Sequence, residues 1–418
     1  MNVFQRQLPS AAAWSLMLLC ITGPLSAQPM NVVAPTYESL LQQLETFPSQ
    51  RETAALYEAS LGRLDQSKTI SNPVLTLEVD NFLGTGERKG FGGSETTLSA
   101  TQPIENPSKR RARIAVAGAQ VDATANRGED SRWRAAARLA QAYVDAEAAI
   151  ARHALATEGM SLAEAETRAL AALVREGREA KFREIQAQSE LASVRSQLDE
   201  ASANRAIALA RLAAIVMRDQ PIEALGSSLL NLSPSHLSDG TTESPQIRIA
   251  RAETLVADKQ VTFEKRRAMP DFSVTLGLRH FANERDAALV AGVGITIPIF
   301  DRNTGNIRAA AAELRAAEAR LAAVELEVRA EKVAADAAMF ASQSRVNAAR
   351  VSVSTAREAY RLSRIGVDAG RISQLELRAS RAALVSALRS EVDAKLARAN
   401  AEIQLAQIEG RLPFGVQR

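Results

Sequence analysis

The sequence predicts a mainly helical chain with a small β portion, in which one plan of helix, strand, strand and two long helices occurs twice. The first indication is where prolines are missing: none lies between Pro107 and Pro221, and none between Pro298 and Pro413. Both stretches are rich in Ala, Arg, Glu and Leu and hold few glycines, which is typical of very long helices. The other two indications are alternating apolar residues before each stretch and a constant spacing between matching landmarks.

Each proline-free stretch follows two segments in which apolar and polar residues alternate. In the first segment Leu75, Leu77 and Val79 share one face, while Thr76 and Glu78 share the other. A period of two indicates a β-strand with one apolar face. We therefore expect strands at about 73–82 and 95–104 in the first copy, and at about 271–281 and 289–299 in the second.

Matching landmarks recur at a nearly constant spacing, which indicates an internal repeat. Pro73 corresponds to Pro270 and Gly177 to Gly370, about 195 residues apart in each case. The expected units are a first repeat at 28–217, with long helices over 107–217, and a second at 245–418, with long helices over 305–410. Residues 218–244 join them, and shorter leading helices are expected at about 36–71 and 245–268. A glycine-marked turn divides each long stretch, so each copy ends in a helical hairpin.

Residues 1–27 have the features of a secretory signal peptide. Arg6 supplies the positive charge, residues 11–21 form an apolar segment too short to span a bilayer, and Leu25-Ser26-Ala27 resembles a cleavage site. Cys20 leaves a lipoprotein as the alternative. The residues before it are bulky, whereas lipidation favours small ones, so an ordinary cysteine of the apolar segment is the preferred interpretation.

Composition argues against several classes of function. Lys and Arg number 51 and Asp and Glu 48, a net charge of +3, and aromatic residues make up only 4%. The charges are interspersed, whereas nucleic-acid grooves need clustered basic residues and stacking rings. Cys20 is the only cysteine, and His153, His236 and His280 are scattered along the chain. We therefore expect no enzyme, no cofactor, no metal site and no nucleic-acid partner.

The expected strands cannot form a complete structure within one chain. Segments of about ten residues with an apolar and a polar face are typical of outer-membrane barrels, and lipid does not tolerate an open sheet edge. Four strands are too few for a hollow barrel. Two copies of the chain would give about 8 strands and three would give about 12, with room for a passage. The alternative is a soluble periplasmic coiled coil that carries small β-hairpins.

Three segments carry a resemblance to a known family: residues 72–82 (NPVLTLEVDNF), 95–105 (ETTLSATQPIE) and 297–307 (IPIFDRNTGNI). The chain resembles the TolC-like outer membrane factor family over essentially its whole mature length. Within that family it is most similar to the outer-membrane component of cobalt–zinc–cadmium-type cation efflux systems. Residues 106–110 (NPSKR) depart from the Gly-Gly-Lys-Arg-like turn that is usual there, so the junction between barrel and helix is expected to differ locally.

The resemblance implies a homotrimer in the outer membrane of a Gram-negative bacterium. A 12-stranded β-barrel would continue as an α-helical barrel through the periplasm, and its tip would dock a periplasmic adaptor (membrane fusion) protein and an inner-membrane proton-driven RND pump. The implied function is an efflux duct for heavy-metal cations, with multidrug efflux or type I protein secretion as alternatives. A periplasmic coiled-coil adaptor or scaffold is the alternative from another class.

The two hairpin turns would then lie at the periplasmic tip, where three copies of each charged side chain approach one axis. Rings of charge select ions and can latch a pore. The candidate gate residues are Arg175, Glu176, Arg178, Arg183 and Glu184 in copy one, and Arg364, Asp368, Arg371 and Glu376 in copy two. Gly177, Gly366 and Gly370 are the candidate adaptor-docking turns. The alternatives are ordinary pairing on a helix surface and simple helix breaking.

Overall fold

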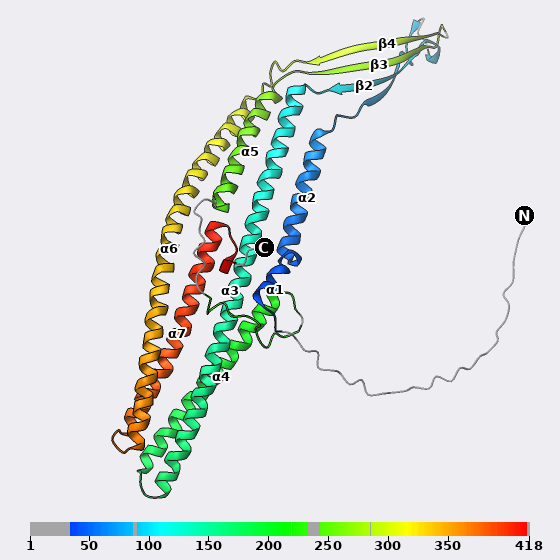
Figure 1. Cartoon of the computed structure of the whole chain (residues 1–418). Helices are drawn as coiled ribbons and strands as arrows, with labels where there is room; N and C mark the ends of the chain where they lie inside the picture. The colour runs from blue at the N-terminus through cyan, green and yellow to red at the C-terminus, as the bar shows by residue number, and fades with distance from the viewer. Residues whose placement is uncertain (1–33, 87–89, 219, 233–242, 285, 416–418) are drawn as a thin grey trace, which may run out of the picture.

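The computed structural model describes residues 34–86, 90–218, 220–232, 243–284 and 286–415. The expected signal peptide and Cys20 lie outside these residues. A four-stranded sheet stands at one end of an elongated molecule, and two long helical hairpins turn at the other end (Figure 1). No helix in these ranges combines the length and the apolar character needed to cross a membrane.

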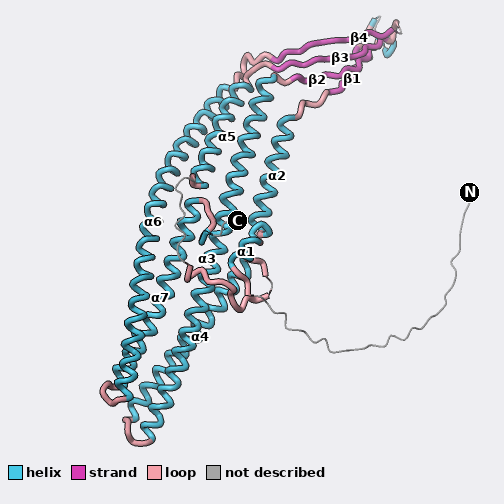
Figure 2. The backbone as a smooth tube through the Cα atoms, in the orientation of Figure 1, coloured by secondary structure: helices cyan, strands magenta, loops and turns pink. Residues whose placement is uncertain are grey.

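The same order of elements occurs in both halves of the chain. The first half contains α2 (Pro48–Lys68), β1 (Val74–Asp80), β2 (Glu95–Ile104), α3 (Pro107–Arg175) and α4 (Lys181–Ile215). The second half contains α5 (Pro245–Arg267), β3 (Asp271–Phe281), β4 (Asp286–Thr296), α6 (Thr304–Asp368) and α7 (Gln374–Glu409). Helices α2, α3, α5 and α6 contact one another in this order and continue the four strands downwards (Figure 2).

The strands pair antiparallel in the order β1-β2-β3-β4, which leaves β1 and β4 as edges. The register gathers the apolar residues on one face, because each cross-strand row draws on positions of the same parity. One row consists of Leu77, Leu98, Leu278 and Leu289. Leu289 is 84% exposed, so nothing in the described chain covers this face.

The opposite face of the sheet is polar and carries its own contacts. Arg279 lies 3.2 Å through Nη1 from Glu95 Oε2, and its Nε donates to Thr97 Oγ1 at 3.0 Å. The hydroxyls of Thr101 and Thr275 are 2.8 Å apart. The sheet therefore has the apolar and polar faces that a membrane barrel needs.

Two expected boundaries were wrong. Strand β4 runs over Asp286–Thr296 rather than about 289–299; Pro298 has no N–H to continue a ladder. The leading helix of copy one is not continuous over 36–71. It is divided into α1 (Tyr37–Gln42), the 3₁₀-helix η1 (Leu44–Thr46) and α2, because Pro48 forces Phe47 into an extended conformation.

The largest apolar core lies midway along the molecule, where α1, α3, α4, α7 and the segment after α4 meet. Tyr37, Leu139, Tyr143 and Leu212 are fully buried in it. The Tyr143 hydroxyl contacts the Ser227 hydroxyl at 2.9 Å and accepts from the Ser227 backbone N–H at 3.1 Å. Elsewhere the buried positions of α3 are mostly alanine, which lets neighbouring helices approach closely. This core holds the bases of both hairpins.

Candidate functional site at the hairpin tips

The turn between α3 and α4 is closed by backbone hydrogen bonds around Gly177. Gly177 has a φ of +71°, a conformation that favours glycine. The N–H of Arg178 donates to the carbonyl of Leu173 at 2.9 Å, and the N–H of Gly177 donates to Val174 at 3.1 Å. This pair of bonds is a Schellman motif, which satisfies the last carbonyls of α3.

The turn between α6 and α7 repeats this geometry. Gly370 also has a φ of +71°, and its N–H donates to Val367 at 2.9 Å, while Arg371 donates to Gly366 at 2.8 Å. Gly366 has a different requirement: a Cβ there would lie 2.5 Å from Cδ1 of Ile372. The expected turn glycines thus divide into two that set the backbone and one that makes room for a side chain.

The helices that leave the two turns begin differently. Ser373 caps α7 and forms a capping box with Glu376, whose carboxylate accepts the Ser373 N–H at 2.8 Å and hydroxyl at 2.9 Å. These hydrogen bonds, the one from the backbone N–H above all, lower the pKa of the Glu376 carboxyl. Ala180 caps α4 without a side-chain bond. Glu376 therefore has a local role that its acidic character alone did not predict.

The candidate charges of copy one pair within their own turn. Arg178 lies 3.4 Å from Glu176, and Arg183 lies 3.8 Å from Glu179. Glu184 lies 2.7 Å from Lys181, one turn earlier on α4. Arg175 donates to the carbonyl of Ala171 at 3.3 Å. None of these contacts reaches the other hairpin.

The remaining candidates of copy two, Arg364, Asp368 and Arg371, are exposed. No side-chain ion pair links them to another described residue. The structure brings all nine candidate charges to the same end of the molecule (Figure 1) but does not join the two turns through them.

A cluster that the sequence did not suggest joins the hairpins instead. Arg381 on α7 binds Glu166 on α3 and Glu190 on α4, with 2.6 Å between nitrogen and oxygen in each pair. Arg378 also pairs with Glu166 and lies 3.8 Å from Glu190. The two arginine side chains are only 11% and 12% exposed. We call these four residues the inter-hairpin cluster.

Further polar contacts continue the junction toward the core. Arg152 on α3 pairs with Asp393 on α7 at 2.6 Å. Arg389 donates to Gln197 on α4 at 2.8 Å. The hairpins are thus joined by directional contacts from α7 of copy two to both α3 and α4 of copy one, and a change at one of these contacts would alter how the two tips sit together.

A signal for the cluster exists in the repeat itself. With Gly177 placed on Gly370, Glu166 and Glu190 correspond to Ala359 and Ala383. In the reverse direction, Arg378 and Arg381 correspond to Ile185 and Gln188. The sequence thus carries acids in one copy and bases in the other at unmatched positions, as expected for two surfaces that face each other.

Nothing at the tips resembles a metal or cofactor site. Within the described ranges, no group of three or more His, Cys, Asp or Glu side chains is placed to hold a metal ion. The tips present two turns, exposed charged side chains and a junction between the helices of the two hairpins.

Comparisons with known proteins agree with this architecture. The outer membrane efflux protein family matches residues 41–216 and 237–411. The nickel-cobalt-cadmium resistance protein NccC of Alcaligenes xylosoxydans xylosoxydans is 37% identical over 297 residues, which cover 70% of this chain and 67% of that protein. The nickel and cobalt resistance protein CnrC of Cupriavidus metallidurans is 37% identical over 66% of this chain and 67% of its own.

Solved structures show the same fold at low sequence identity. The outer membrane protein VceC from Vibrio cholerae superimposes with a TM-score of 0.73 at 19% identity, over 90% of this chain and 96% of its own. CusC gives a TM-score of 0.77 at 17% identity, over 90% of this chain and 92% of its own. The expected fold class is confirmed, and the channel is favoured over the adaptor, the scaffold and an enzyme. The chain belongs to the outer membrane efflux protein family: it is an outer membrane efflux channel with a TolC-like fold and a large periplasmic portion.

Proposed function

We propose that the chain assembles as a homotrimeric duct that exports divalent heavy-metal cations in a tripartite system with a periplasmic adaptor and an inner-membrane RND pump. The observation that supports a metal-cation cargo is the similarity to NccC and CnrC, whose names state resistance to nickel and cobalt. Multidrug efflux and type I secretion are the competing cargoes.

The open sheet supports the trimer. Edges β1 and β4 expose unpaired backbone groups, and lipid imposes a cost of several kcal/mol on each such group. Pairing β4 of one protomer with β1 of the next removes both edges, and three protomers close a barrel of about 12 strands. In this proposal, 28–217 and 245–418 each supply two strands and one hairpin, and 218–244 joins them.

The tips supply the gate in this proposal. Each protomer has one inter-hairpin cluster, which holds its two hairpins together. The three clusters of the trimer set the width of the periplasmic opening. The charges Arg175, Glu176, Arg178, Arg183, Glu184, Arg364, Asp368, Arg371 and Glu376 line or flank that opening. Gly177, Gly366 and Gly370 shape the turns on which the adaptor docks.

The test deletes the gene in its native host and complements it with the full chain. Loss of growth in nickel, cobalt, cadmium or zinc, with unchanged growth in hydrophobic drugs, is the expected result. Sensitivity to drugs without sensitivity to metals would contradict the proposal that the cargo is a metal cation. Unboiled electrophoresis of outer-membrane extracts tests the assembly separately: a heat-labile species near three times the monomer mass supports the trimer, and a monomer alone would contradict it.

A further inference from the structure

The apolar face of the sheet ends at a sharp boundary. Ile104, Phe272 and Ile295 form its last cross-strand row next to the helices. Ile297 and Ile299 continue the same parity beyond the strand, and the Phe300 side chain is 99% exposed. Arg302 follows immediately. An exposed aromatic ring beside a cation at the edge of an apolar band is typical of a membrane–water interface.

Exposed cations lie at the helix ends that meet this boundary. They come from the last turns of α2 and α5, the first turns of α3 and the residues before α6. We call them the basic collar: Arg63, Arg110, Arg111, Lys265, Arg266 and Arg302. Figure 1 shows these four helix ends together at the base of the sheet.

Four carboxylates of this region pair with cations outside the collar, and a fifth, Asp301, accepts the N–H of Asn303 at 3.0 Å. Asp65 pairs with Lys68 at 2.9 Å, Asp271 with Lys109 at 2.7 Å and Glu105 with Arg113 at 2.9 Å. The buried Glu264 pairs with Arg267 at 3.6 Å and accepts from Asn303 at 2.6 Å. No collar residue forms an ion pair with a described carboxylate. The collar therefore concentrates positive charge in a chain whose total net charge is only +3.

Two collar residues place positive charge at a helix N-terminus, where negative charge is preferred. Arg110 and Arg111 lie at the start of α3, whose first turn contains no acidic residue. Positive charge near a helix N-terminus is unfavourable, because the backbone dipole is positive there. An external anion placed beside these two side chains would offset that cost.

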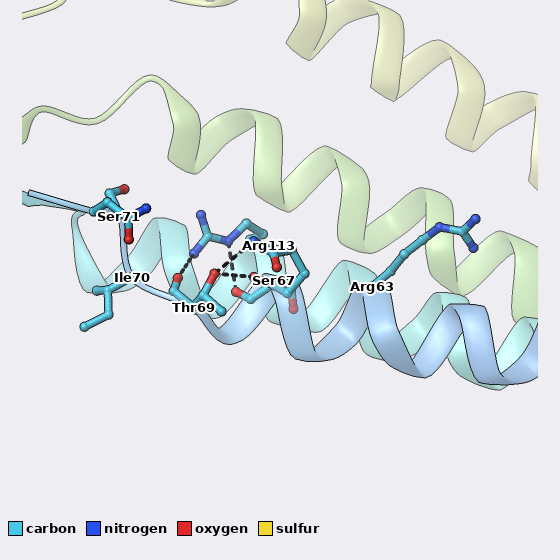
Figure 3. Close-up of a pocket in the computed structure, with 8 residues that line it drawn as sticks. Arg63, Ser67, Thr69, Ile70, Ser71 and Arg113 are labelled. Atoms are coloured by element: carbon cyan, nitrogen blue, oxygen red, sulfur yellow. Dashed lines mark hydrogen bonds between the residues drawn. The ribbon is translucent and has the colours of Figure 1, made fainter. Parts of the chain in front are cut away.

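A groove beside the collar shows how such an anion could be held. It is an open polar groove lined by Arg63, Ser67, Thr69, Ser71 and Arg113. Arg113 turns onto the carbonyls of Ser67 and Thr69, at 3.0 and 3.1 Å, while Arg63 extends away from them (Figure 3). Arg113 thus fixes the end of α2, and Arg63 keeps a guanidinium available to solvent.

We propose that the basic collar binds the anionic headgroups of phospholipids in the periplasmic leaflet, with Phe300 seated at the boundary of headgroups and acyl chains. The proposal rests on the outer-membrane location of the sheet. Guanidinium groups bind phosphate oxygens in a bidentate geometry, and each Lys or Arg near an anionic surface contributes about fivefold in affinity. The collar therefore selects phosphatidylglycerol over zwitterionic lipid and fixes the depth of the barrel.

The test uses the full chain purified in detergent and mixed with phosphatidylglycerol or phosphatidylcholine. The wild type should retain at least tenfold more phosphatidylglycerol and should keep its oligomer to a higher temperature in that lipid. The variant R110Q/R111Q/K265Q/R266Q should lose this preference. A matched variant, R195Q/R211Q/R329Q/R357Q, removes four exposed arginines from α4 and α6 and should behave like wild type.

Equal retention of phosphatidylglycerol by the collar variant would overturn the proposal. The proposal would also be overturned if inorganic phosphate kept the wild-type oligomer to the same temperature as phosphatidylglycerol does, because the bound anion would then not need to be a lipid. A charge-conserving variant, R110K/R111K/R266K, separates lost charge from lost packing and should keep the preference. Electrophoresis of the same samples reports the trimer independently, so failure of the collar is distinguishable from failure of the proposed assembly.

Discussion

The turns at Gly177 and Gly370 have the same backbone but different side chains. Both glycines have a φ of +71°, and both turns close with the same pair of backbone hydrogen bonds. Around this common frame, copy two adds a capping box and a glycine packed under Ile372, and copy one adds neither. The backbone is thus common to the repeat, while the side chains of the two copies have diverged.

The divergence matters most one to four helical turns from the tip. There copy one presents Glu166 and Glu190, and copy two presents Arg378 and Arg381. If copy two repeated copy one, isoleucine and glutamine would stand at the positions of Arg378 and Arg381, and the two acids would have no counter-charge. Because the copies carry opposite charges, the hairpins of one chain pair with each other in one defined way.

The largest expected effect comes from breaking this pairing. In E166Q/E190Q, the two arginines would keep their charge at 11% and 12% exposure without a counter-charge, which costs about 3 kcal/mol or more. Under the proposed gate, the hairpins would separate and the single-channel conductance in planar bilayers would rise several-fold. The control is E358Q, which removes an exposed carboxylate that pairs with Arg361 on its own helix. Unchanged conductance of E166Q/E190Q would refute a gating role for the cluster.

A double-mutant cycle of E190Q and R381Q sharpens this comparison. The 2.6 Å pair between these residues joins different hairpins, so thermal unfolding should give a coupling energy of about 1–3 kcal/mol. The same cycle on Glu358 and Arg361 should give a much smaller coupling energy, because both side chains of this pair are exposed to solvent on one helix. Similar coupling in both cycles would mean that burial adds nothing at the cluster.

The sequence predicts what is local and misses what is distant. Proline-free stretches and period-two alternation act over a few residues, so the long helices and the strands were found. The break before Pro48 is also local, but the expectation of one helix at about 36–71 did not include it. The inter-hairpin cluster joins Glu166 to Arg381 across 215 residues, and no local pattern reports such a contact. Only the loss of symmetry between the copies could have suggested it.

The next effect concerns the shared backbone. Alanine at Gly177 or at Gly370 would keep a positive φ at a cost of about 1–2 kcal/mol, and the two costs should be equal because the geometry is the same. Gly118→Ala is the matched control: it lies inside α3 with nothing within 4 Å, so it should be neutral or stabilising. Thermal unfolding measures all three. A clear difference between the two turn variants would show that the turns are not equivalent.

Exchanging the caps should make the copies alike. Ser373→Ala removes the side-chain bond at the start of α7 and should cost about 1 kcal/mol, whereas Ala180→Ser should stabilise α4 by up to a similar amount. Amide exchange in the first turns of α4 and α7 measures both effects. If Ala180→Ser left exchange in α4 unchanged, the cap would not be what distinguishes the two helix starts.

The smallest expected effect is the dependence on pH that the capping box gives to copy two. Hydrogen bonds from Ser373 lower the pKa of Glu376 below its ordinary value of 4.5, so its capping contribution is fully present above that value. It is lost as the pH falls through the lowered pKa, because the protonated carboxyl no longer accepts the Ser373 N–H as strongly. Amide protection at the start of α7 should therefore weaken in acid relative to α4, where Arg183 occupies the matching position. In E376Q this difference should lose its pH dependence, since glutamine does not titrate; a pH dependence that persisted there would have to arise from another group.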